Sequence, residues 1–227
     1  KNSFLYIENT KILLKNILID NFNISKLYVK SNFYTSPITL ISEELNLENV
    51  EILNAVGEDA INIVNSRFNI KNLKINNSSS DALDIDNSNG KIKDLKIENC
   101  KNDCLDLSSS KISIFNLLAN TSNDKNISIG ENSEILINNA VVDNCKKICI
   151  AIKDQSNVIL ENIEISNGDI GIAMFIKKDI FQPPFLTSKK LIFNDVKYNL
   201  ATDSKINEKN FDLKYKPYKI NVNEIYR

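Results

Sequence analysis

Aspartates recur at a fixed interval in the middle of the chain. The run DALDID begins at Asp81, and the similar run DCLDLS begins at Asp103, 22 residues later. This interval aligns Asp84 with Asp106. If the two runs stack as neighbouring strands, their carboxylates lie about 4.8 Å apart and repel each other. Either one carboxylate then retains a proton or a cation lies between the two, and both outcomes are chemistry that a functional site can use.

The candidate site residues surround this aspartate pair. The candidates for catalysis are Asp84, Asp106 and Lys125, and the candidate ligands of a Ca²⁺ ion are Asp84, Asp86 and Asp106. A tight calcium loop of the form D-x-D-x-D-G is absent from the sequence. The lysines of the following repeats can meet acidic groups of a ligand. The expected substrate-binding residues are Asp81, Asp86, Asp103, Lys153, Lys177, Lys178 and Phe181.

The four cysteines occupy two equivalent positions of the repeat. Cys100 aligns with Cys145, and Cys104 aligns with Cys149, in both cases two repeats apart. Two strand spacings amount to roughly 9.6 Å, which exceeds the reach of a disulfide. Cys104 also aligns with small residues, Ala60 among them. The sequence therefore predicts small buried thiols, with a bridge inside one repeat as the alternative, and it does not favour metal ligation.

The aspartate runs belong to a repeat that extends through most of the chain. Related runs begin at Asp59, Lys125, Cys149 and Gly171, with slips of one residue. Each repeat contains three short segments in which apolar and polar residues alternate, and this alternation is typical of β-strands. A period of 22 to 23 residues with three strands per turn predicts an all-β solenoid, a right-handed parallel β-helix. A leucine-rich repeat is the rival, but its second segment would be a helix or an irregular arc.

Two polar columns run in register with the apolar ones. An amide repeated at one turn can bond to the next coil and satisfy the polar groups of the turn. We therefore expect an asparagine ladder at one corner and a serine stack at another. The ladder comprises Asn54, Asn77, Asn99, Thr121, Asn144 and Asn167, and the stack comprises Ser66, Ser88, Ser110, Ser133 and Ser156.

The repeat also predicts how the chain is divided. Residues 1–46 lack the clean period and are expected to form irregular first coils or an N-terminal cap. Residues 47–200 are expected to form the β-helix, interrupted at 177–190 by a loop insertion that contains two prolines. This loop is a candidate wall of a ligand groove. Residues 201–227 are expected to form a C-terminal cap, because the open end of a solenoid must be covered.

Composition limits the partners. The 227 residues carry a formal net charge of −1, so no basic field collects nucleic acid. The longest apolar runs, such as residues 148–152, are far shorter than the roughly 20 residues that cross a bilayer, so no membrane insertion is expected. The sequence begins at Lys1 rather than Met, as expected for a mature form or for one part of a longer chain with further domains.

The repeats resemble those of right-handed parallel β-helix proteins. The runs DALDIDNSNG, NDCLDLSSS and DKNISIGENS are similar to bacterial surface β-helix repeats, over about residues 55–194. Enzymes with this fold include pectate lyases, polygalacturonases and C5-epimerases, which act on acidic polysaccharides. This chain has no His, and Arg occurs only at Arg67 and Arg227, so none of the His- or Arg-centred motifs of those enzymes is matched.

The resemblance implies an extracytoplasmic domain, whether secreted, periplasmic or at the cell surface, that recognises or processes a polysaccharide on its acidic outer face. If it is an enzyme, it is a lyase, hydrolase or epimerase. No cofactor is expected other than Ca²⁺. The alternative function is a non-catalytic surface or scaffold module for protein interaction. A fold of this kind is specific for architecture and weak for function, and an acidic face that only keeps the solenoid soluble is a third interpretation.

Overall fold

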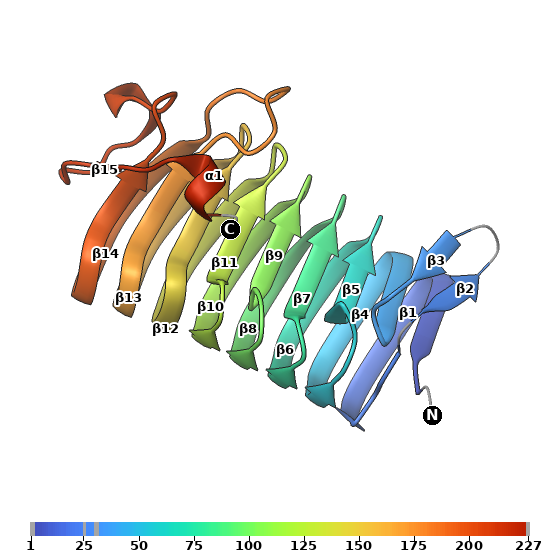
Figure 1. Ribbon diagram of the computed structural model, residues 1–227. Helices are drawn as coiled ribbons and strands as arrows, with labels where there is room; N and C mark the ends of the chain where they lie inside the picture. Colours follow the sequence, from blue (N-terminus) through green and yellow to red (C-terminus); the bar gives the residue numbers. More distant parts are fainter. Residues whose placement is uncertain (1–2, 25, 30–31, 226–227) are drawn as a thin grey trace.

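The chain winds into a parallel β-solenoid. The computed structural model describes residues 3–24, 26–29 and 32–225. The coils follow one another along the solenoid in sequence order, from blue to red in Figure 1. The elements in chain order are β1 (Leu5–Asp20), β2 (Leu27–Val29), β3 (Asn32–Tyr34), β4 (Ile38–Ala55), β5 (Asp59–Val64), β6 (Arg67–Ser78), β7 (Asp81–Asp86), β8 (Asn89–Cys100), β9 (Leu105–Ser108), β10 (Lys111–Ser122), β11 (Lys125–Gly130), β12 (Glu134–Lys153), β13 (Asn157–Phe175), β14 (Phe185–Thr202), a short 3₁₀ turn (Glu208–Asn210), β15 (Tyr218–Lys219) and α1 (Val222–Ile225).

Each coil has three outer faces, and parallel pairing holds the same residue columns in register on all of them. We call the face that carries residues 81–86 the acidic face, the face that carries 89–92 the second face, and the face that carries 94–99 the third face. Leu83 pairs with Leu105, and both are fully buried inside the solenoid. This alternation of inward and outward side chains confirms the predicted strands, and the predicted fold is correct.

Residues with a left-handed backbone conformation form the corners of the coils. Asn77 has a φ of 63°, Asn99 of 59° and Asn144 of 54°, all in the region that Asn tolerates better than most residues. Their amides donate to the preceding coil, as the ladder prediction required. Asn77 Nδ2 lies 2.9 Å from Asn54 Oδ1, whereas Asn99 Nδ2 bonds to Asn76 Oδ1 at 2.8 Å. The ladder therefore bonds to more than one residue of the coil below, and it lies on the exposed surface.

The serine stack is buried and continuous. The backbone N–H of Ser66 donates to Ser88 Oγ at 2.9 Å, and Ser88 N–H donates to Ser110 Oγ at 3.0 Å. The same contact links Ser110 to Ser133 and Ser133 to Ser156. Each hydroxyl satisfies a buried backbone donor of the neighbouring coil, so this predicted column is confirmed.

The N-terminal residues are more regular than the sequence indicated. β1 pairs in parallel with β4 along its whole length. Asn16 turns the chain as Asn49 does one coil later, and Asn49 Nδ2 donates a hydrogen bond to Asn16 Oδ1 at 3.0 Å. The antiparallel pair β2 and β3 is inserted between these coils. It lengthens the separation to 33 residues and hides the period. The expected boundary at residue 46 lies inside β4 and is not a structural boundary.

The loop insertion is shorter than expected. Its irregular part covers residues 176–184, because residues 185–190 already belong to β14 and pair with β13. Pro184 is buried, Phe185 is 47% exposed in the strand, and Phe181 is half-buried rather than exposed.

The cysteines form two disulfides, so the prediction of free thiols is wrong. Cys100 bonds to Cys104 and Cys145 bonds to Cys149, with Cα–Cα distances of 5.3 Å and 5.0 Å. The sequence reasoning compared cysteines on different coils. Each C-x-x-x-C run instead turns the corner between two faces of one coil, and the turn brings its two Cα atoms within disulfide reach. No free cysteine is found in the part of the chain that the structure describes.

Candidate ligand site on the acidic face

Two columns of polar side chains run along the acidic face. The central column contains Thr39, Asn62, Asp84, Asp106, Ser128, Ala151 and Ala173. The corner column contains Asp59, Asp81, Asp103, Lys125, Ile148 and Ile170. Asp86 lies beside the central column, two residues after Asp84. Parallel pairing thus brings six aspartates together on three adjacent coils, and it places Asp84 directly between Asn62 and Asp106.

The central column is half-buried and incompletely hydrogen-bonded. Asn62 Nδ2 donates to Asp84 Oδ2 at 3.0 Å. Among the described residues, Asn62 Oδ1 and Asp106 Oδ1 have no hydrogen-bond partner although both atoms are buried, and the same holds for Thr39 Oγ1. Buried acceptors without donors are rare and demand a reason. Three of them in one column leave this strip short of hydrogen-bond donors.

The clustered carboxyl groups hold protons more tightly than usual. Burial, reinforced by the charges of Asp59, Asp86 and Asp106, raises the pKa of Asp84 to about 10. Burial and the charge of Asp106 also raise the pKa of Asp86, whose carboxylate accepts a hydrogen bond from Asp84. Asp84 is therefore a neutral acid at pH 7 that shares its proton with Asp86. Of the two compensations that the sequence offered, protonation is the one that this geometry favours.

The corner aspartates have a structural role. Asp81 Oδ1 accepts the backbone N–H of Asp103 at 2.8 Å and the Nδ2 of Asn102 at 2.6 Å. Asp103 Oδ1 accepts the backbone N–H of Lys125 at 3.0 Å. Each carboxylate thus satisfies the turn of the next coil, although burial and the charge of Asp103 raise the pKa of Asp81 to about 7. Asp81 and Asp103 were predicted to bind substrate, but these carboxylate oxygens face the protein.

Lys125, a predicted catalytic residue, lies in a buried ion pair. It is 3% exposed, and its Nζ lies 3.2 Å from Asp103 Oδ1 and also contacts Asp124. Burial alone would lower the pKa of Lys125, but the carboxylates of Asp103 and Asp124 outweigh it and raise the pKa. A buried ammonium held by two carboxylates is a poor proton acceptor and is shielded from a ligand.

The remaining lysines lie at the C-terminal edge of the acidic cluster. Lys153 is 6% exposed and donates to Ser128 Oγ at 2.7 Å. Lys177 is exposed. Partial burial, together with the charge of Lys153, lowers its pKa, while Asp106 acts in the opposite sense. Lys178 pairs with Glu131. Lys177 therefore lies near enough to the central column for its pKa to respond to the charge of Asp106.

Two contributors were missed by sequence reasoning. Asp154, 1% exposed, accepts the backbone N–H groups of Lys177 at 2.6 Å and Lys178 at 2.9 Å, so it fixes the start of the loop beside the acidic face. Its place directly after a strand and before a turn was the available signal. Asn62 is the second, and the alignment of the run that begins at Asp59 with the run that begins at Asp81 was the signal that places it beside Asp84.

The predicted Ca²⁺ site at Asp84, Asp86 and Asp106 stays a prediction. Within residues 3–24, 26–29 and 32–225, no group of three or more His, Cys, Asp or Glu side chains is placed to hold a metal ion. Asp84, Asp86 and Asp106 lie together, and the raised pKa of Asp84 favours a proton rather than a metal ion at that carboxyl group.

The other half of the same face is closed. Ile148, Ala151, Ala173 and Phe175 form a small apolar cluster. Ile220, Val222 and Ile225 of the C-terminal segment pack on it, and α1 lies over this part of the solenoid in Figure 1. The acidic half is therefore the part of this face that remains for a ligand. No helix of the described residues has the length and apolar character needed to cross a membrane.

Comparison with known proteins identifies the class. The family model described as "Right handed beta helix region" matches residues 38–180, which is more than half of the chain. The chain belongs to this family, and the β-solenoid is a right-handed parallel β-helix. Searches of curated proteins and of solved structures found no match.

Proposed function

We propose that the acidic face recognises a polysaccharide, with Asn62, Asp84, Asp86 and Asp106 contacting sugar hydroxyls. The observation that carries the proposal is the central column, where buried acceptors lack donors next to a carboxyl group that keeps its proton. A sugar hydroxyl is both donor and acceptor. It can donate to the partly exposed carboxyl groups of Asp86 and Asp106 and accept from the protonated Asp84.

Lys177 adds a cationic group at one end of this strip, so an acidic group on the ligand has a partner there. A carboxyl group that keeps its proton at pH 7, as Asp84 does, is also one of the two groups that acid-assisted cleavage of a sugar chain uses. Processing of the bound chain is therefore the extension of this proposal, and recognition is its core.

An extracytoplasmic location belongs to the same proposal. Two disulfides in a chain without a free cysteine among its described residues suit an oxidising compartment, because thiols in the cytosol are kept reduced. This support is independent of the family resemblance.

The test is binding of a panel of neutral and acidic oligosaccharides to the wild type and to Asp84→Asn with Asp106→Asn. A matched control is Glu51→Gln with Asp169→Asn, which removes two exposed charges elsewhere. We expect saturable binding by the wild type and the control, and at least a tenfold loss in the Asp84/Asp106 variant. Binding that is equal in all three proteins, or absent throughout the panel, contradicts the proposal. Release of new reducing ends or of unsaturated products would add processing.

A further inference from the structure

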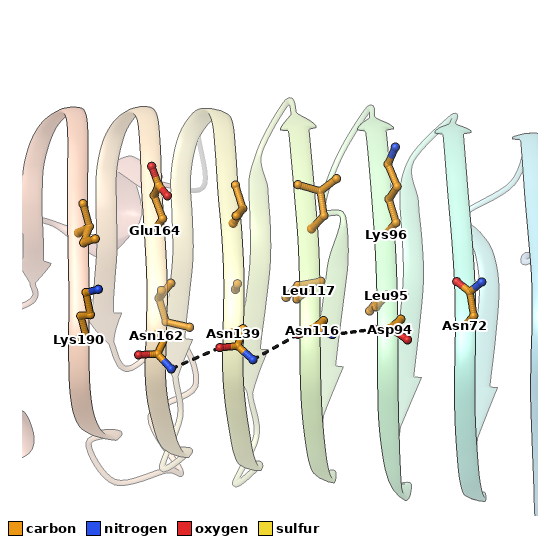
Figure 2. A pocket seen from close by; sticks show the side chains of 15 residues that line it. Asn72, Asp94, Leu95, Lys96, Asn116, Leu117, Asn139, Asn162, Glu164 and Lys190 are labelled. Atoms are coloured by element: carbon orange, nitrogen blue, oxygen red, sulfur yellow. Dashed lines mark hydrogen bonds between the residues drawn. The ribbon is translucent and has the colours of Figure 1, made fainter.

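The third face carries a groove that the function proposed for the acidic face does not use. It has a volume of about 450 Å³ and crosses β6, β8, β10, β12, β13 and β14. One side is a ladder of polar side chains, in which Asn116 donates to Asp94 at 2.7 Å and Asn162 donates to Asn139 at 3.3 Å (Figure 2). Each rung consumes one donor and one acceptor of its neighbours, so the ladder is rigid.

Beside the ladder runs a column of outward side chains that contains both charged and aliphatic residues. In coil order it reads Leu18, Glu51, Lys74, Lys96, Leu118, Val141, Glu164 and Ile192. Val141 is 42% exposed and Ile192 is 39% exposed, so the apolar part of the column is open. Lys96 lies on the N-terminal side of Leu118 and Val141, and Glu164 lies on their C-terminal side.

The four inner members of this column, from Lys96 to Glu164, are complementary to their own reverse, whereas the next pair outward sets Lys74 against Ile192. A two-fold axis that lies in the interface, parallel to the strands and between β10 and β12, places Leu118 of one copy against Val141 of another. It also places Lys96 against Glu164 at both ends. The same two-fold axis also brings the polar ladders of the two copies together, with Asn116 facing Asn139 and Asp94 facing Asn162. Isologous contacts of this kind are the commonest basis of homodimers.

We propose that the third face is the interface of a homodimer in which two solenoids pack face to face with antiparallel axes. The aliphatic side chains fill the facing grooves, and the two Lys96–Glu164 pairs fix the direction. Lys96 Nζ lies 2.8 Å from Glu98 and Glu164 accepts from Asn194 Nδ2 at 3.0 Å, so each pair across the interface adds to a contact that its members already make within their own chain. Two sheets packed in this way lie about 10 Å apart, which leaves room for one layer of side chains from each.

The area of the third face limits the affinity of the dimer. Six coils at about 4.8 Å and five residues at about 3.3 Å give a face of roughly 29 by 17 Å. That area is at the low end for specific interfaces, so we expect a dimer with a Kd of about 10 to 500 μM.

The experiment uses charge reversals and their mixture. Lys96→Glu alone places Glu against Glu164, and Glu164→Lys alone places Lys against Lys96, so each variant should dimerise at least ten times more weakly than the wild type. An equimolar mixture of the two variants restores opposite charges at both ends and should form a heterodimer. Lys91→Glu on the second face is the matched control and should dimerise as the wild type does.

Sedimentation equilibrium up to about 1 mM measures the Kd, and native mass spectrometry of isotope-labelled chains detects the heterodimer. A wild type that remains monomeric throughout overturns the proposal. A dimer that is unchanged by either reversal, or a mixture that forms no heterodimer, shows that any association uses another surface and overturns it as well. Circular dichroism confirms that each variant keeps the β-helix.

Discussion

The protonated state of Asp84 predicts a stability that falls as the pH rises. Its folded pKa of about 10 lies far above the value of about 3.9 in the unfolded chain. Between these two values the folded chain binds one proton more than the unfolded chain. The free energy of unfolding therefore decreases with rising pH, by up to about 1.4 kcal/mol per pH unit. From pH 5 to pH 8 the contribution of Asp84 to this loss reaches at most about 4 kcal/mol. Asp59 and Asp81, whose pKa values burial raises to about 6 and about 7, add to it in the same sense.

Asp84→Asn tests this reasoning directly. Asparagine is nearly isosteric and stays neutral, so the uptake of a proton on folding is no longer needed. At pH 7 that uptake costs up to about 4 kcal/mol, and the variant should be more stable by up to this amount. Urea unfolding followed by far-ultraviolet circular dichroism at pH 5, 6, 7 and 8 gives both quantities. The pH dependence of the variant should be clearly flatter than that of the wild type.

Asp169→Asn is the control, because Asp169 is an exposed aspartate outside the acidic cluster. Its pH dependence should match that of the wild type. Measurements above pH 5 leave the Lys125–Asp124 ion pair intact. Burial alone would raise the pKa of Asp124, but Lys125 outweighs it and lowers the pKa, so this carboxylate protonates only at lower pH. A wild type whose stability is constant or rises from pH 5 to pH 8 would refute the protonated Asp84, and so would a variant with an unchanged slope.

Two further predictions concern the corners. Asn99→Ala should destabilise the chain by about 1 to 3 kcal/mol, because alanine disfavours a φ of 59° and loses the bond to Asn76, while Asn99→Gly should cost less. Urea titration measures both, with Asn69→Ala on the exposed side of β6 as the control, and an effect at Asn99 no larger than at Asn69 would contradict the ladder. Replacing Cys100 and Cys104 together by alanine should cost about 2 kcal/mol from the chain entropy of a short loop. The wild type unfolded without reductant should show no thiol to Ellman's reagent, and four reactive thiols would contradict both disulfides.

The repeat made the fold and the columns predictable. Because a parallel coil returns each residue position to the same face, aligning Asp84 with Asp106 was enough to place the two side by side. The serine stack followed in the same way, since one hydroxyl per coil can serve one backbone N–H. Strand register depends only on the spacing of residues along the chain, so it can be read from the sequence.

The direction of side chains at the corners was not predictable from register alone. Asp81 and Asp103 share the repeat of the acidic cluster, yet they turn to backbone N–H groups of the next coil, which only the path of the turn reveals. The cysteines show the same limit, because a corner inside one coil brought together residues that the comparison between coils kept apart. Asn87, which appears as an ordinary exposed residue in the sequence, has a φ of 45° and bonds to Asn65 at 2.6 Å.

The strongest reason to connect the acidic face with a function is that the fold does not need it. The central column accepts Asn62, Ser128 and Ala151 at equivalent positions, and all three are neutral. The carboxyl group of Asp84 costs stability at pH 7, because it must be kept protonated against its ordinary pKa. Solubility alone would be served by exposed carboxylates, such as those on the second and third faces. A half-buried, proton-sharing cluster beside Lys177 is what a site for sugar hydroxyls would require, and it is the feature that the Asp84 and Asp106 variants remove.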